Sequence, residues 1–171
     1  IYAQRLAADG TALWPAGGVA VVGAESGQRN PALLADGSGG LLIAWEDYRN
    51  DDLDNDMTWD VYAGRVTAAG AVAWEVPLIR AIYTQDQVAV VADGAGGMLV
   101  FWQDGRDLGN PDIYGSRVTG DGTVLFPDDT GVQLTSGTVN ESLAAAVSGT
   151  TGRALVFWYD DPAGPHDLVG Q

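Results

Sequence analysis

One sequence pattern recurs along this chain about every 55 residues, and it constrains the fold more than any other feature. Each copy has a glycine-rich turn, an apolar run that ends in Trp, and an Asp two residues after that Trp. A loop of variable length follows, and then a second run that begins with Asp. Two clear copies lie at residues 36–66 and 93–118, and a degraded third copy lies at 148–169. This repetition predicts a fold that stacks one supersecondary unit.

Strand signals fill each repeat unit. The units are anchored at four corresponding positions, which are Ile1, Val61, Ile113 and Leu168. Between these anchors, short apolar runs alternate with Gly and Asp turns, and no stretch of about ten residues shows the period of a helix. Nineteen of the 23 acidic residues are Asp, which favours turns over helices. About four short strands per unit is the pattern of a β-propeller blade.

The sequence therefore predicts an all-β chain that forms a single β-propeller repeat region over residues 1–171, with about three blade-equivalents of four strands. A parallel β-helix would need shorter repeats, and a β-sandwich would not repeat its aromatic positions. The small residues of 31–35, 88–92 and 143–147 predict the innermost strands, because the central channel of a propeller is crowded.

The repeated aromatic and charged residues are predicted to be structural. Three copies of one charged pattern fit blade packing and ion pairing better than three active sites. The residues concerned are Trp45, Asp47, Arg49, Tyr62, Arg65, Trp102, Asp104, Arg106, Tyr114, Arg117, Trp158 and Asp160.

The pattern W-x-D-x-R followed by D-[IV]-Y-x-x-R resembles the repeats of bacterial secreted and cell-surface β-propeller proteins. It runs from Trp45 to Arg65 and from Trp102 to Arg117, and the wider resemblance covers nearly the whole chain. The resemblance implies a propeller and an extracellular or cell-surface location, and it implies no single activity. The third copy departs from it, because Pro162 stands where Arg is expected and Val169 where Tyr is expected.

The repeat phase predicts two complete blades and two half-blades, because residues 1–4 and 168–171 both match the third strand of a unit. Three blades are too few for a ring, and exposed strand edges are rarely tolerated. We therefore expect strands from outside to complete the ring. Either a second copy of the chain gives a six-bladed homo-oligomer, or adjacent repeats of a longer chain do so.

An acidic loop between two predicted strands carries Asp52, Asp54, Asp56 and Asp60 at positions one, three, five and nine. Ca²⁺ prefers six to eight oxygen ligands from a tight turn, so this spacing predicts a candidate calcium loop. It is similar to the loops of integrin-type propellers, although Met57 replaces the turn glycine. The alternative is a solvated acidic loop. Bound calcium would order the loop and would not catalyse a reaction.

Charge and composition exclude several function classes. A formal net charge of −15 argues against nucleic-acid partners, which need a basic patch. No apolar run is long enough for a membrane-spanning helix. The chain has no Cys, and His166 is its single His, so a Cys nucleophile or a zinc site of Cys and His cannot form. A Ser-His-Asp triad is not supported, because no G-x-S-x-G motif occurs.

The sequence favours a non-catalytic binding or structural module of a secreted or cell-surface bacterial protein. One alternative is a lectin-like carbohydrate-binding propeller, because Tyr48, Trp59, Tyr83 and Tyr159 lie in or near loops and could stack on sugar rings. Another alternative is a glycoside hydrolase or lyase, for which Glu46 and Glu141 are candidate carboxylates. The loops after the Trp strands vary most between units, which disfavours a lectin with one identical site per blade.

Overall fold

The computed structural model describes residues 1–49, 58–107, 110–126, 130–150, 152–161 and 167–170. Within these residues the chain forms thirteen strands and no helix. The strands are β1 (Tyr2–Ala3), β2 (Val19–Ala20), β3 (Gln28–Ala35), β4 (Leu41–Asp47), β5 (Asp60–Val66), β6 (Val72–Ile79), β7 (Gln85–Ala92), β8 (Met98–Asp104), β9 (Asp112–Val118), β10 (Val132–Gln133), β11 (Asn140–Ser148), β12 (Ala154–Asp161) and β13 (Asp167–Gly170).

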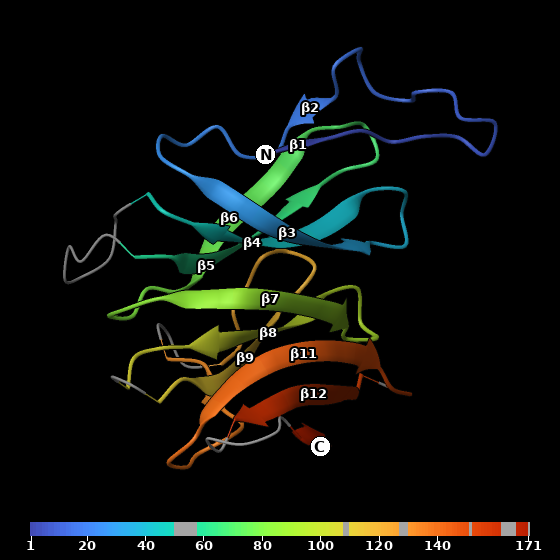
Figure 1. Ribbon diagram of the computed structural model, residues 1–171. Coiled ribbons are helices and arrows are strands. Elements are labelled where there is room, and N and C mark those ends of the chain that lie inside the picture. The colour runs from blue at the N-terminus through green and yellow to red at the C-terminus, as the bar shows by residue number, and fades with distance from the viewer. Residues whose placement is uncertain (50–57, 108–109, 127–129, 151, 162–166, 171) are drawn as a thin grey trace.

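Consecutive strands pair antiparallel, so each sheet is a meander. The described strands form a two-stranded sheet β1–β2, the four-stranded sheets β3–β6 and β7–β10, and the three-stranded sheet β11–β13. Below, the sheets β3–β6, β7–β10 and β11–β13 are called the first, second and third sheets. Figure 1 shows the sheets stacked one after another along the chain, from the N-terminus to the C-terminus. The predicted all-β class is confirmed.

Turn chemistry closes the first hairpin of the first two sheets. Asp36 Oδ1 accepts hydrogen bonds of 2.8 Å from the backbone nitrogens of Ser38 and Gly40. Asp93 repeats this turn through bonds to the second and fourth residues after it, of 2.7 and 2.8 Å. A Cβ on Gly40 would lie 2.2 Å from the carbonyl oxygen of Val66, so the close approach of these two backbones requires glycine.

Successive side chains along a strand point to opposite faces of the sheet, so each sheet packs apolar side chains against the sheet on either side. On β4, Leu42 and Ala44 face the second sheet, whereas Ile43 and Trp45 face the N-terminal segment. The first-to-second interface buries Leu42, Ala44, Val61, Ala63, Leu78, Ile79, Met98, Val100, Trp102, Tyr114 and Val118. The second-to-third interface buries Val91, Phe101, Ile113, Leu143 and Val156.

The first strand of each sheet lies beside the first strand of the next. β7 contacts β3 on one side and β11 on the other, as Figure 1 shows. Each of these strands has a register shift about three residues after its start, the feature of a β-bulge. At the bulges of β3 and β7, Asn30 and Gln87 adopt positive φ angles of 50° and 54°. These strands include the ranges 31–35, 88–92 and 143–147 that were predicted to be innermost.

The repeat anchors occupy equivalent places in the sheets. Val61, Ile113 and Leu168 lie in β5, β9 and β13, which are the third strands of their sheets. In the part of the chain that the structure describes, no helix is long and apolar enough to cross a membrane.

Candidate functional site

The repeated Trp, Asp, Arg and Tyr of the first sheet form one compact cluster. Trp45 Nε1 donates to Asp47 Oδ2 over 2.7 Å. Arg49 donates to both oxygens of the same carboxylate, with distances of 2.9 and 2.5 Å. The guanidinium of Arg49 lies 4.0 Å from the centre of the Tyr62 ring, which stacks against Trp45. The Asp47 carboxylate and the Arg49 guanidinium therefore bind each other and the aromatic side chains of the strands.

The second sheet repeats this cluster. Trp102 Nε1 donates to Asp104 Oδ2 over 2.9 Å, and Arg106 binds both oxygens of Asp104 at 2.9 and 2.6 Å. The guanidinium lies 4.1 Å from the centre of the Tyr114 ring. Burial opposes the charge of Arg106, but its hydrogen bonds and ion pair with Asp104 outweigh burial and raise its pKa. An arginine held this way remains a cation and does not transfer protons.

The third sheet departs from the cluster. Trp158 and Asp160 occupy the equivalent positions on β12, in register with Leu143 and Glu141 of β11. Pro162, which stands in place of the arginine, lies outside the described residues. Asp160 therefore lacks the repeated arginine that neutralises Asp47 and Asp104.

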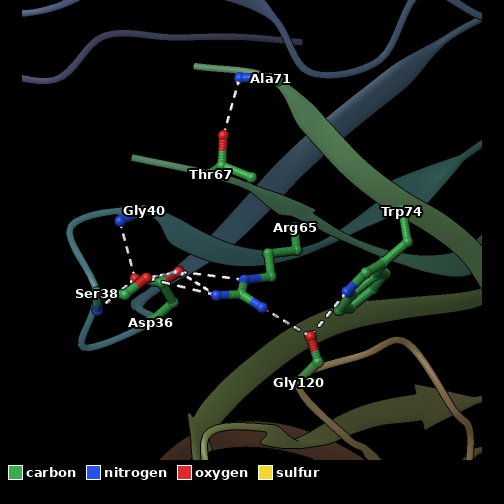
Figure 2. A network of polar contacts seen from close by, with 8 residues as sticks. All are labelled: Asp36, Ser38, Gly40, Arg65, Thr67, Ala71, Trp74 and Gly120. Carbon is green, nitrogen blue, oxygen red and sulfur yellow. Dashed lines mark hydrogen bonds and ion pairs between the residues drawn. The ribbon is translucent and has the colours of Figure 1, made fainter. Parts of the chain in front are cut away.

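A second repeated arrangement links one sheet to the next (Figure 2). Arg65 donates to Asp36 Oδ2 over 3.1 and 2.9 Å, and its Nη1 reaches the carbonyl oxygen of Gly120 at 3.0 Å. Trp74 Nε1 donates to the same oxygen at 3.0 Å. Burial would raise the pKa of Asp36, but the hydrogen bonds from Ser38, Arg65 and Gly40 outweigh it and hold this pKa at about 2.

The N-terminal segment makes the same link to the first sheet. Arg5 Nη1 and Trp14 Nε1 both donate to the carbonyl oxygen of Ala68, at 3.3 and 3.0 Å. In the second sheet Arg117 binds Asp93 at 2.8 Å, as Arg65 binds Asp36. Phe126 stands where Trp14 and Trp74 stand, and it has no N–H with which to bind a carbonyl.

The candidate calcium loop falls mostly outside the structure. Asp52, Asp54 and Asp56 lie outside the described residues. Asp60 is buried at the start of β5, in register with Asp47. Among the described residues, no group of three or more His, Cys, Asp or Glu is arranged to hold a metal ion.

A cavity of about 270 Å³, lined by both polar and apolar side chains, lies beside the first strands of the three sheets. Glu46, which is 1 % exposed, is at its wall. The Glu46 carboxylate accepts hydrogen bonds from Arg29 Nε at 2.6 Å, from Asn30 Nδ2 at 3.1 Å and from the backbone nitrogen of Gln87 at 2.9 Å. The last bond crosses from the first sheet to the second. The left-handed backbone at both bulges places Asn30 and Gln87 beside this carboxylate.

Asp86 is the second carboxylate of the cavity, and Val88, Ala89 and Leu143 are its apolar lining. Burial raises the pKa of Asp86, the charge of Glu46 raises it further, and Arg29 opposes the shift. The cavity therefore combines one carboxylate that is fully hydrogen-bonded with another that takes up a proton more readily than an exposed Asp.

Two aromatic side chains lie beside Arg29, the residue that binds Glu46. The guanidinium of Arg29 lies 3.9 Å from the centre of the Trp59 ring, and Trp59 lies 5.1 Å from Tyr48 between ring centres. Trp59 is half-buried. Of the other aromatic residues considered for sugar stacking, Tyr83 is 36 % exposed and Tyr159 is 45 % exposed.

The two glutamates considered for hydrolysis lie at different interfaces. Glu46 lies between the first and second sheets. Glu141 lies at the start of β11, where its backbone nitrogen donates to the carbonyl oxygen of Pro111 at 2.9 Å. The structure therefore does not place them as one carboxylate pair.

Sequence reasoning missed Arg29, Asn30, Asp86 and Gln87 as site residues. These positions differ between the repeats, so a search for repeated residues passes over them. An alignment of the repeats could have found them, because it places all four residues one or two positions after the Gln that begins β3 and β7.

Comparisons with protein-family models, with curated proteins and with solved structures find no match to this chain.

Proposed function

We propose that this chain is part of a β-propeller that acts as a non-catalytic binding or structural module. Support comes from the stacking of successive meander sheets with their first strands side by side. The same Arg and Trp contacts recur between the N-terminal segment and the first sheet and between the first and second sheets. Recurrence of one contact geometry gives each step a similar rotation, which is how a blade array curves into a ring.

We further propose that a second copy of the chain covers the outer face of the third sheet. Val147, Leu155 and Tyr159 are 47, 50 and 45 % exposed on this face. Leu155 is equivalent to Leu42 of the first sheet. The second sheet covers Leu42, which is only 1 % exposed. A further sheet of the same kind would cover these apolar side chains as the second sheet covers Leu42, and a neighbouring copy would supply it.

We propose a non-catalytic module because the buried carboxylates named here are bound by donors of the protein itself. The repeated Asp residues 47 and 104 are bound by both a Trp and an Arg. Glu46 accepts four hydrogen bonds from Arg29, Asn30 and the Gln87 nitrogen, so both of its oxygens are bound by donors of the protein. This observation favours binding over hydrolysis.

The cavity beside Glu46 is the binding site that this proposal favours. The second candidate function is carbohydrate binding at this site, because the Trp59–Tyr48 pair lies next to Arg29. Sugar hydroxyls donate well to a carboxylate such as Asp86, and apolar sugar faces pack on aromatic rings. An extracellular or cell-surface location, as the sequence resemblance implies, would expose this site to glycans.

A glycan-array screen followed by calorimetry tests the proposal. Wild-type protein is compared with Asp86→Asn and Trp59→Ala, and Glu25→Gln is the matched control because Glu25 is exposed and outside the cavity. We expect a glycan whose affinity falls at least tenfold in both Asp86→Asn and Trp59→Ala and is unchanged in the control. Release of reducing sugar from the bound glycan, abolished by Asp86→Asn, would show that the module is an enzyme instead. Binding that neither variant weakens would exclude this cavity.

A further inference from the structure

The interface between the second and third sheets contains three carboxyl groups near one another. Glu141 of β11 is 5 % exposed and lies in register with Asp160 of β12. Asp112, at the start of β9, is 3 % exposed. The bond from the Glu141 nitrogen to the carbonyl oxygen of Pro111 joins the start of β11 to the residue before β9. The cluster therefore sits where the third sheet attaches to the second.

The first interface has a neutral residue in the equivalent place. Gln85 is in register with Asp104, as Glu141 is with Asp160. Gln85 Nε2 donates to the carbonyl oxygens of Ile82 and Tyr83 at 3.2 and 2.9 Å, and approaches Asp104 Oδ1 at 3.5 Å. The amide of Gln85 therefore supplies hydrogens at this point of the first interface, and a charged glutamate would supply none.

Among the described residues, no basic side chain forms an ion pair with the acidic cluster of the second interface. In the part of the chain that the structure describes, none of the ion pairs reaches Asp112, Glu141 or Asp160. The groups that face Asp112 from β10 and beyond are neutral: Gln133 Nε2 donates to it at 2.8 Å, and Thr135 Oγ1 lies 3.4 Å from it.

Two buried oxygen atoms of the cluster lack a protein donor in the described residues. They are Glu141 Oε2 and Asp160 Oδ1. An uncompensated buried carboxylate is costly, and a neighbouring carboxylate increases the cost. Burial raises the pKa of Glu141, a hydrogen bond with Asp112 adds to this effect, and the charges of Asp112 and Asp160 add further, to about 7.

We propose that Glu141 is a proton-binding residue at the interface between the second and third sheets. Its protonated carboxyl donates a hydrogen bond to Asp112. This donor hydrogen corresponds to the amide hydrogens that Gln85 supplies in the first interface. When the pH rises, this proton leaves to solvent and a negative charge develops next to two carboxylates. The attachment of the third sheet to the second is then weakened.

The direction of the pH effect follows from the shifted group. In the unfolded chain a glutamate loses its proton near 4.5, and in the folded protein Glu141 keeps it to about 7. Its contribution to stability is fully present below 4.5 and is lost as the pH rises to about 7. Asp36 has a lowered pKa and acts in the opposite direction at lower pH.

The direct test is carboxyl NMR of wild-type protein labelled with ¹³C at the glutamate carboxyl. The chain has four Glu residues, so four resonances are expected, and Glu141→Gln assigns one of them by its disappearance. We expect the Glu141 resonance to titrate well above the ordinary value of 4.5. A Glu141 midpoint at or below 4.5 overturns the proposal. If Glu141→Gln does not fold, Asp112→Asn assigns the resonance by shifting its midpoint downward.

Urea unfolding at several pH values tests the effect on attachment. We expect the wild-type midpoint to fall from pH 4.5 to pH 7 more steeply than that of Glu141→Gln, with Glu25→Gln behaving as wild type. Hydrogen exchange should show faster opening of β11 and β12 at the higher pH in wild type only. Equal pH dependence in wild type and Glu141→Gln would overturn the proposal. A Glu141 midpoint that one millimolar Ca²⁺ lowers would also overturn it, because the cluster would then hold a metal.

Discussion

Arg65 of β5 donates from Nη1 to the carbonyl oxygen of Gly120, 3.0 Å away in the turn that follows β9. The same guanidinium binds the buried carboxylate of Asp36, so one side chain closes a hairpin and holds the next sheet. Trp74 shares the Gly120 oxygen. Two side chains of the first sheet therefore hold the turn that follows β9 of the second sheet.

Removal of Arg65 should therefore destabilise the protein more than removal of Trp74. Arg65→Met leaves the Asp36 carboxylate without its cation, and we expect a loss of about 3 kcal/mol in the free energy of unfolding. Trp74→Phe removes one hydrogen bond and should cost about 1 kcal/mol. Urea denaturation measures both, with exposed Arg153→Met as the control. Equal losses of unfolding free energy in Arg65→Met and Arg153→Met would contradict a stabilising role for the Arg65 contacts with Asp36 and Gly120.

Asp104 and Asp160 occupy equivalent positions but should respond in opposite ways to the same substitution. Asp104→Asn weakens the bonds to Trp102 and Arg106, and we expect a loss of about 2 kcal/mol because Asp104 is buried. Asp160→Asn removes a charge beside Glu141 and should be neutral or stabilising at pH 8. Thermal unfolding at that pH distinguishes them. A larger loss for Asp160→Asn would show that the third cluster is held by a cation.

The sheets could be predicted from the sequence because their spacing is fixed by backbone geometry. Trp45 and Asp47 lie two residues apart, so they share a face of β4, and the Asp can accept the indole N–H. The Asp36 turn could be predicted in the same way, since its glycines permit the positive φ angles that it needs. These features depend on neighbours in sequence.

The candidate site could not be predicted in this way, because long-range contacts build it. Glu46 meets the Gln87 nitrogen only after β4 and β7 have been packed together. The bulges that direct Asn30 and Gln87 have no glycine to mark them. Glu141 was accessible to comparison of the repeats, since Gln85 occupies its place in the preceding unit, but its burial beside Asp112 required the structure.

Acid should weaken the hairpin turn that Asp36 closes. The Asp36 pKa is lowered to about 2, so its stabilising contribution is present above the ordinary value of 3.8 and is lost as the pH falls toward 2. We expect Asp36→Asn to be less stable than wild type at pH 6 and to show a smaller further loss on acidification. Circular dichroism with urea at each pH measures this. Parallel pH profiles of the two proteins would contradict the assignment.

The exposed face of the third sheet should mediate self-association. Leu155→Asp places a charge in the middle of this face, so we expect the oligomer to dissociate while the fold is retained, since Leu155 is 50 % exposed. Leu125→Asp is the matched control, because Leu125 is 46 % exposed outside the third sheet. Light scattering over a range of concentrations measures the mass. A wild-type protein that stays monomeric throughout would rule out a second copy as the partner.

An open apolar pocket of about 420 Å³ also lies between the second and third sheets, lined by Leu99, Phe101 and Trp158 among others. Ala154 lines it, and the equivalent residue of the second sheet is Met98, which is fully buried in the first interface. The shorter side chain at position 154 thus leaves space that the first interface fills. Ala154→Met should restore this packing and stabilise the protein by about 1 kcal/mol.

The reverse substitution supplies the matched control for this cavity. Met98→Ala should open equivalent space in the first interface and cost about 3 kcal/mol, because a fully buried side chain is truncated. Urea unfolding measures both changes, and fluorescence of an apolar dye should fall in Ala154→Met and rise in Met98→Ala. Destabilisation by Ala154→Met together with unchanged dye binding would show that the side chains around Trp158 do not leave room for methionine.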